Sequence, residues 1–289
     1  MSSLQVIQTA ASVAVISFLA ACGGGGSDGT TTPVTPVTPV ASVTAIGSAS
    51  ALSYGKSTVL NVTGTNLDQG IALLVPGCSS LIERAGSTAT ARSYTCVVTA
   101  ATSLPVTATT TAGASLLAAA LAVPDPQVTM VTSMGSFILE LNPAKAPLSV
   151  NNFLKYTADG FYSNTLFHRV ISNFVVQGGG FTTGPVAKTA TYNPIKLESN
   201  NGLSNLRGTL AMARTNAADT ATSQFYVNVV DNTALDYVSA SAPGYAVFGK
   251  VVDGLAAVDL IKAVPTETRN GLASIPVADV LIFSALQTR

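Results

Sequence analysis

The sequence predicts a mainly β protein in which a small β-sandwich precedes a closed antiparallel β-barrel capped by two helices. Three observations support this fold class. Short β-type runs, separated by Gly, Ser and Asn, fill residues 41–123 at the spacing of a small sandwich. Apolar runs joined by Gly-rich turns fill residues 127–289, where helical periodicity is confined to two segments. A chain of 289 residues is long enough for two ordinary domains and a tail.

Charge is scarce and balanced along the chain. Only 10% of the residues are charged, 47% are hydrophobic, and 14 basic residues are matched by 14 acidic ones. A protein that binds nucleic acid through its phosphates has a basic stripe, and this sequence has none. The composition therefore excludes nucleic acid as the expected partner.

The first 22 residues have the pattern of an export signal peptide. The apolar run Ala10–Leu19 is too short to span a bilayer and leads into Leu19-Ala20-Ala21-Cys22. This tetrapeptide resembles the bacterial lipobox, which implies lipidation of Cys22 after cleavage. We expect a lipid anchor in the cell envelope, and Gly23 favours the outer membrane, facing the periplasm. Residues 2–21 lack Lys and Arg, unlike usual signals, so a disordered apolar N-terminus is the alternative.

A linker and a β-rich region follow. Residues 23–40 combine a run of glycines with Thr-Pro-Val repeats, a composition that buries no core and favours an extended chain. Within residues 41–123, Ser57–Thr63 and Ser93–Thr99 have strand character. Val62–Leu67 resembles immunoglobulin-like bacterial surface modules, so we expect an immunoglobulin-like sandwich.

Cys78 and Cys96 lie in this same region. An exported chain meets an oxidising compartment, where such a pair usually forms a disulfide. Closing this loop would contribute about 3 kcal/mol by restricting the unfolded chain. A metal or catalytic role is the alternative, but no histidine or third cysteine lies nearby in the sequence.

The second region begins after Val123-Pro124-Asp125-Pro126, because two prolines remove backbone donors and favour extended geometry. Gln127–Thr132 and Ser136–Leu141 then predict a hairpin with its turn at Met134-Gly135. One helix is expected to begin at Pro147, which suits a first helical turn, and to end at Gly160. A second helix is expected around Asp253–Ala263.

Five blocks of this region resemble the successive signatures of the cyclophilins, and they occur in the family's order over residues 127–289. The blocks are Phe167-His168-Arg169-Val170, Phe174–Gln177 with the glycines that follow, Gly208–Ala213, Ser223-Gln224-Phe225 and Val247-Phe248-Gly249. The resemblance is closest to the short bacterial subclass. It implies a cyclophilin-like barrel and peptidyl-prolyl cis/trans isomerase activity on proline-containing polypeptides, without a metal or other cofactor.

The chemistry of that reaction suits the residues of these blocks. The peptide bond has a rotation barrier of about 18–20 kcal/mol, and no covalent step is needed to cross it. A catalyst has to favour the twisted amide, whose nitrogen gains lone-pair character. Arg169 is assigned as the permanent donor to that nitrogen, and Gln177 as the residue that holds the substrate backbone or orients Arg169. The apolar socket for the proline ring is assigned to Phe174, Val175, Tyr226 and Leu235.

Other site residues follow from the resemblance. His168 is the only histidine, which excludes sites built from several histidines, and we expect it at the pocket wall among the catalytic residues. The remaining substrate-binding residues are expected to be Ala213, Arg214, Thr215, Gln224 and Tyr245. Structural roles are the alternatives: a core position for His168, Phe174 or Tyr226, and a surface ion pair for Arg169.

Several positions depart from the family pattern. Tyr226 replaces a usual Phe, Val175 a usual Met, and Ala234 a Trp or Phe that helps to cover the pocket in relatives. We expect a shallower pocket and only weak binding of cyclosporin. Arg214 replaces the Asn of many eukaryotic members, and Tyr245 replaces a His.

The sequence favours an exported isomerase that assists the folding of envelope proteins. The alternatives are a non-catalytic module that binds proline-containing peptides, or a surface adhesion protein whose β-domain carries the function. A hydrolase is disfavoured because the Gly-x-Ser-x-Gly motif is missing.

Overall fold

The computed structural model describes residues 39–289. The expected signal peptide, Cys22 and nearly all of the 23–40 linker lie outside the described residues. Within the described part of the chain, no helix is both long enough and apolar enough to cross a membrane.

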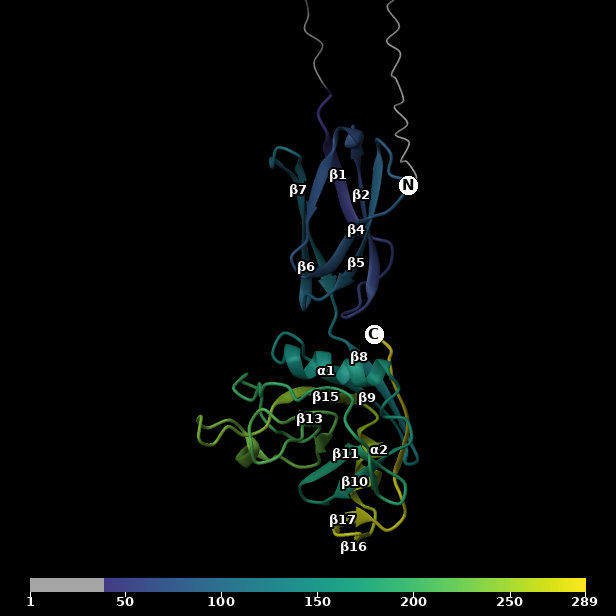
Figure 1. Ribbon diagram of the computed structural model, residues 1–289, viewed down its shortest axis with the longest axis vertical. Coiled ribbons are helices and arrows are strands. Elements are labelled where there is room, and N and C mark those ends of the chain that lie inside the picture. The colour runs from purple at the N-terminus through teal and green to yellow at the C-terminus, as the bar shows by residue number, and fades with distance from the viewer. Residues whose placement is uncertain (1–38) are drawn as a thin grey trace, which may run out of the picture. The chain divides into compact units, whose positions relative to one another are not determined.

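Residues 42–123 form two antiparallel sheets (Figure 1). In these strands alternate residues are buried, as the period of two of a β-strand requires. The four-stranded sheet has the order β1-β2-β5-β4, and the three-stranded sheet has the order β3-β6-β7. The bounds are β1 Ser42–Ser48, β2 Ser57–Thr65, β3 Ile71–Leu74, β4 Cys78–Glu83, β5 Ala91–Val98, β6 Thr102–Thr110 and β7 Ser115–Val123, with a 3-10 turn η1 at Leu67–Gln69.

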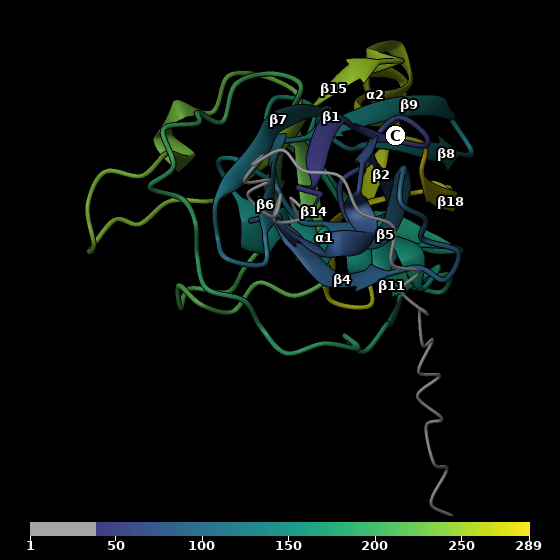
Figure 2. The ribbon, with the colours of Figure 1, turned by 90° about the horizontal axis from the view of Figure 1, so that it is seen from above.

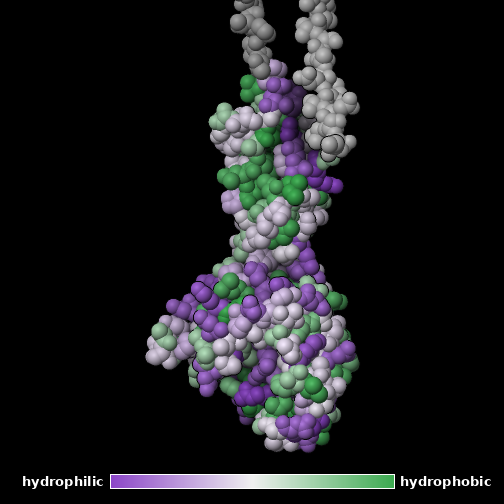
Figure 3. All heavy atoms as spheres, viewed as in Figure 1, coloured by the Kyte–Doolittle hydropathy of each residue, from purple (hydrophilic) through white to green (hydrophobic). Residues whose placement is uncertain are grey.

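The Ala-rich stretch 115–122 is a strand, although alanine favours helices. Its strand, β7, pairs with β6 over nearly its whole length, from Val123 opposite Thr102 to Ser115 opposite Thr109. Tertiary pairing thus overrides local propensity here. β7 is an edge strand whose alanines are partly exposed, and Figure 3 shows hydrophobic atoms gathered over this part of the chain.

A disulfide joins Cys78 of β4 to Cys96 of β5, with the two Cα atoms 5.5 Å apart. The two strands are neighbours in the four-stranded sheet, so the bond crosses directly between paired strands. Cys96 is fully buried. The bond therefore fastens β4 to the core strand β5.

Residues 127–289 form a closed antiparallel barrel with two helices (Figure 1). Eight strands follow the order β10-β18-β8-β9-β15-β13-β14-β11, and pairing of β10 with β11 closes the ring. Closure removes the exposed edges that an open sheet would leave. The bounds are β8 Gln127–Thr132, β9 Gly135–Leu141, β10 Thr165–Val170, β11 Val175–Thr182, β13 Thr209–Met212, β14 Phe225–Asn228, β15 Val247–Asp253 and β18 Leu281–Gln287.

The remaining elements lie outside this ring. β12 (Val186–Ala187) adds to β11, and β16 (Thr266–Arg269) pairs with β17 (Leu272–Pro276) as a separate hairpin. The short 3-10 helix η2 (Thr233–Leu235) lies in the connection between β14 and β15. Figures 1 and 2 both show this connection extending away from the barrel.

The expected hairpin is present, with its turn one residue earlier than expected. Thr132 pairs with Gly135, so Ser133 and Met134 form the turn. Gly135 has a φ of 112°, which an L-residue rarely adopts. A glycine is therefore favoured at this position, the first residue of β9.

The first helix, α1 (Pro147–Ala158), begins at the expected proline, but its N-terminal cap comes from a distant residue. The carboxylate of Glu198 accepts hydrogen bonds from Leu148 N at 2.9 Å and from Ser149 N and Oγ at 2.8 Å each. An acidic group is favourable there because the first helical N–H groups lack partners and carry partial positive charge. The cap thus ties the 196–200 segment to the helix. The second helix, α2, spans Leu255–Lys262.

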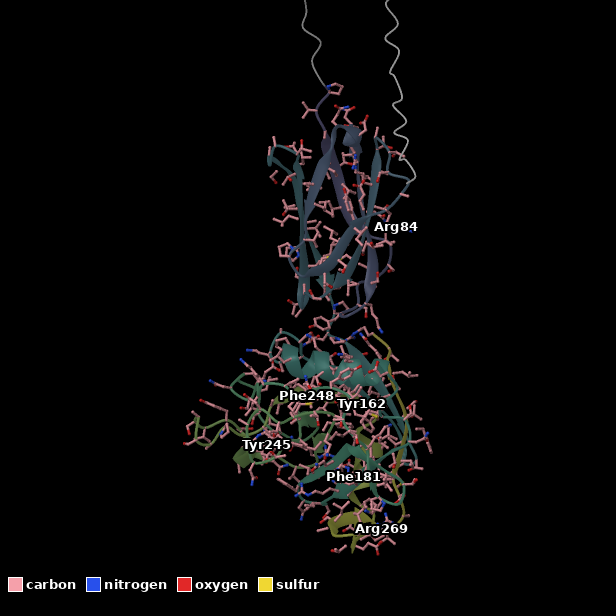
Figure 4. All side chains as sticks on the ribbon, in the orientation of Figure 1. Arg84, Tyr162, Phe181, Tyr245, Phe248 and Arg269 are labelled. Atoms are coloured by element: carbon pink, nitrogen blue, oxygen red, sulfur yellow. A yellow bond between two sulfur atoms is a disulfide. The ribbon has the colours of Figure 1, made fainter. Side chains whose placement is uncertain are left out.

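The barrel interior is filled by aromatic rings. Phe153 of α1 packs edge-on against Phe225 with ring centroids 5.4 Å apart, and Tyr162, labelled in Figure 4, packs against the same ring with centroids 5.4 Å apart. Phe137, Phe167 and Phe248 are also almost fully buried. Edge-to-face contacts suit the ring quadrupoles and add to the burial of apolar area. This core supports the strands that carry the site.

Candidate active site

A cavity of about 310 Å³ brings together most of the predicted site residues. They come from the barrel strands β10, β11 and β14, from η2, and from the connections that follow β10 and β13 and precede β15. The residues that line the cavity are Arg169, Phe174, Val175, Gln177, Ala213, Arg214, Tyr226, Leu235 and Tyr245. A somewhat larger cavity, of about 390 Å³, contains none of the predicted site residues.

Strand register explains why three of these side chains meet. Arg169 of β10 pairs with Gln177 of β11, and Gln177 pairs in turn with Tyr226 of β14. Residues at paired positions of neighbouring strands project from the same face. The three side chains therefore form one row across the barrel wall.

Two hydrogen bonds orient this row. Arg169 Nη1 donates to Gln177 Oε1 at 3.3 Å, and Gln177 Nε2 donates to Gln224 Oε1 at 3.0 Å. A guanidinium has five N–H donors, so this one bond leaves others available. The guanidinium carbon also lies 5.6 Å from the centroid of the Phe174 ring. Arg169 is thus held in place with donors free beside an aromatic surface.

The floor of the cavity is apolar and separate from the main core. Val175, Ala211, Tyr226 and Val247 form a buried cluster of their own, with exposures of 0 to 4%. Phe174, Ala213, Leu235 and Tyr245 pack against it while partly exposed. A dry socket of this size next to a cation suits a small apolar ring attached to a polar backbone.

A second cavity, of about 230 Å³, shares part of this wall. It is lined by Gln177, Ala213, Arg214, Thr215, Thr220, Thr222 and Gln224. The structure therefore also brings Thr215 and Gln224 to the site, on the far side of Arg214. Thr220 and Thr222 were missed by sequence reasoning, because nothing in their spacing signals a site.

The comparisons with known proteins agree with this geometry. A family model described as cyclophilin type peptidyl-prolyl cis-trans isomerase matches residues 127–285. The chain belongs to the cyclophilin-type peptidyl-prolyl isomerase family. It is 51% identical over 159 residues to peptidyl-prolyl cis-trans isomerase B of Escherichia coli, which covers 54% of this chain and 96% of that protein.

Other relatives give the same result. Over 169 residues the chain is 50% identical to a peptidyl-prolyl cis-trans isomerase of Acinetobacter baylyi, covering 58% of this chain and 89% of that one. A crystal structure of a cyclophilin type isomerase from Cryptosporidium parvum has a TM-score of 0.50 and 26% identity, covering 57% of this chain and 98% of that chain.

His168 is buried in the cyclophilin domain. The side chain is 4% exposed, and its ring centroid lies 4.5 Å from that of Phe181, which Figure 4 labels. His168 is not among the residues that line the two cavities. Burial lowers the pKa of the imidazole to about 4, so the ring is neutral at pH 7. His168 precedes Arg169 in β10, and its expected role at the pocket wall stays a prediction.

Tyr226, which departs from the family pattern, keeps its ring in the cavity and buries its hydroxyl. The hydroxyl donates to Asn205 Oδ1 at 2.8 Å, and Asn205 Nδ2 donates to Asp236 Oδ1 at 2.9 Å. Burial raises the pKa of the Tyr226 phenol, which therefore stays neutral. Sequence reasoning missed Asn205 and Asp236. The one available signal was that a buried tyrosine hydroxyl needs a partner.

Asp236 remains charged in this network. Burial opposes its charged form, but hydrogen bonds from Ser204 and from the backbone and side chain of Asn205 outweigh it and lower its pKa. Asp236 follows Leu235, which lines the cavity. The other departure, Ala234, is exposed and does not line the cavity.

Acidic, cysteine and histidine side chains do not gather anywhere in residues 39–289 in groups of three or more that could hold a metal ion. The site of the cyclophilin domain offers hydrogen-bond donors, a cation and an apolar socket.

Proposed function

We propose that residues 127–289 catalyse rotation about X-Pro bonds, with Arg169 as the residue that stabilises the twisted amide. The observation that carries this proposal is the placement of its guanidinium, held by Gln177, in the lining of a cavity of about 310 Å³ that has an apolar floor. A proline ring fits such a socket, and its amide nitrogen would then lie at the rim.

The reaction requires only differential binding. The planar amide nitrogen is a poor acceptor, but the twisted nitrogen has a lone pair that a fixed donor can stabilise. Arg169 can supply this donor at any physiological pH because its guanidinium stays charged. Gln177 and Gln224 act as positioning residues, since the chain of two hydrogen bonds fixes the direction of the guanidinium.

The socket contributes by excluding water. Phe174, Val175, Tyr226 and Leu235 surround the ring and lower the effective dielectric around the donor. Ala213, Arg214 and Thr215 bind the peptide backbone beside the proline. This mechanism moves no proton and uses no cofactor.

The test is isomerisation of an Ala-Pro peptide by the full-length protein and its Arg169→Ala variant. We expect kcat/KM to fall by about 10²- to 10³-fold, the range found when one preorganised donor is removed. Circular dichroism serves as the folding control. If the folded wild-type protein binds the peptide without accelerating isomerisation, the domain is a binding module instead.

We further propose that the protein is a lipoprotein of the cell envelope, anchored through Cys22 at the outer membrane and facing the periplasm, where it assists folding. The lipobox-like sequence and the Cys78–Cys96 disulfide, which suits an oxidising compartment, support this. Radiolabelled palmitate should be incorporated into the wild type and lost in Cys22→Ser. Unlabelled wild-type protein would refute the anchor.

Two finer proposals concern the rest of the chain and its ligands. We propose that residues 41–123 are an immunoglobulin-like sandwich, a proposal supported by their two antiparallel sheets. We also propose that cyclosporin binds weakly, because Ala234 offers no aromatic cover. Tight binding of cyclosporin, measured by isothermal titration calorimetry, would contradict the second proposal.

A further inference from the structure

We propose that the isomerase site selects polypeptides that carry an acidic residue next to the proline, and that Arg214 determines this preference. The inference rests on the proposed function of the same site. It concerns which proline-containing segments the site prefers.

The side chains that line the two adjoining cavities carry positive charge and no negative charge. Arg169 and Arg214 are among the residues that line them, and no Asp or Glu is. Within residues 39–289, neither arginine has a carboxylate within 4.0 Å, whereas Arg207, Arg269 and Arg289 each have at least one. The two site arginines thus differ from the other three arginines of the barrel.

Arg214 is held by neutral groups only. Its Nε and Nη2 donate to Gly244 O at 3.0 and 2.7 Å, and its Nη1 donates to Thr215 O at 2.9 Å and Asn216 O at 3.3 Å. Its guanidinium carbon lies 4.5 Å from the centroid of the Tyr245 ring. These four hydrogen bonds fix the side chain and use four of its five N–H donors, but they leave its full charge at the boundary between the two cavities.

The nearby carboxylates are engaged elsewhere. Asp236 accepts hydrogen bonds from Ser204 and Asn205, and Asp219 Oδ1 accepts one from Leu197 N at 2.9 Å. Neither residue lines a cavity. The whole chain has a formal net charge of +0, so a preference for anions cannot come from the overall field of the protein. It has to come from these two local charges.

Arg214 is placed for this role because it lines both cavities. A peptide whose proline occupies the first cavity passes Arg214 as it continues toward the second. An acidic side chain one or two residues from the proline would then approach the guanidinium. For a partly exposed ion pair we expect a gain of about 3- to 10-fold in kcat/KM at low salt.

The experiment compares two peptides that differ only in Glu or Gln beside the proline, with the full-length protein. Each pair is made with the substitution one and two residues before the proline and one residue after it. We expect a Glu-to-Gln ratio of kcat/KM of about 3 to 10 in at least one pair at low salt. In 1 M NaCl, where the Debye length is about 3 Å, the ratio should approach one.

Three variants separate charge from architecture. Arg214→Gln should bring the ratio to about one, whatever it does to the overall rate, because each ratio is measured within one variant. Arg214→Lys keeps the charge but loses the planar contacts, and should retain most of the preference. Lys145→Gln removes an exposed cation that lines neither cavity, and should leave the ratio unchanged.

The failures of the two proposals are distinguishable. If the wild type does not accelerate isomerisation of the neutral peptide, the proposed function fails. If it does so but the ratio is one in all pairs, or survives in Arg214→Gln, the acidic preference assigned to Arg214 is wrong.

Discussion

Asp236 offers the sharpest test of how the pocket is held together. Its carboxylate accepts hydrogen bonds from Ser204 Oγ, from Asn205 N at 2.7 Å and from Asn205 Nδ2 at 2.9 Å. Asn205 is fully buried and also accepts the Tyr226 hydroxyl. The Asp236 carboxylate therefore links the segment between β14 and β15, which carries Leu235, to Tyr226 in the floor of the socket.

The perturbation is Asp236→Ala, and its cost follows from the groups left without partners. The backbone and side-chain N–H groups of Asn205 would lose their acceptor in a site that water reaches poorly. Each unsatisfied buried donor costs about 1–3 kcal/mol, and partial exposure of Asp236 favours the lower end. We expect a loss of about 2–4 kcal/mol in the free energy of unfolding, and an increase in KM as the Leu235 wall loosens.

The assay is urea unfolding of both proteins, followed by near-UV circular dichroism of the tyrosines, since the chain has no tryptophan. Asp236→Asn is the control. It keeps the shape but replaces one acceptor oxygen by a donor, so it should also destabilise the domain. A change below about 0.5 kcal/mol in Asp236→Ala, the level of ordinary surface substitutions, would refute the reasoning.

The same carboxylate predicts a pH dependence. The pKa of Asp236 is lowered in the folded protein. Its contribution is therefore fully present above the unfolded value of about 3.9 and is lost as the pH falls through the folded pKa. As the pH falls below about 4, the free energy of unfolding should decrease more in the wild type than in Asp236→Ala. Parallel curves of unfolding free energy against pH would contradict this.

Three further predictions concern other parts of the chain. The pKa of His168 is lowered to about 4, so the folded state favours the neutral ring and the free energy of unfolding should fall as the pH drops below about 6.5. Over pH 5.5 to 8, kcat/KM should stay constant. A step in kcat/KM near pH 6.5 would argue against a buried, neutral His168. Tyr226→Phe removes one hydrogen bond to Asn205, so calorimetry should find a loss of about 1 kcal/mol with kcat changed less than about twofold. Replacing Cys78 and Cys96 by Ser should lower the free energy of unfolding of the β-rich region by about 3 kcal/mol, measured with denaturant, without lowering kcat/KM. Equal stability of the two proteins would count against a structural role for the disulfide.

Local patterns in the sequence determined much of this protein. Apolar runs joined by Gly-rich turns marked the barrel strands, Pro147 marked the start of α1, and the five blocks predicted the family and most residues of the cavity. These features could be recognised because apolar runs, helix starts and motif spacing are properties of neighbouring residues.

The tertiary structure decided which distant groups meet. Pairing of β11 with β10 and β14 aligned Gln177 with Arg169 and Tyr226, and pairing with β6 made the Ala-rich stretch 115–122 a strand. The tertiary structure also supplied Glu198 as the cap of α1 and buried the His168 ring against Phe181. Periodicity tells which face of an element is buried, but the partner on that face depends on non-local packing, and this is where sequence reasoning failed.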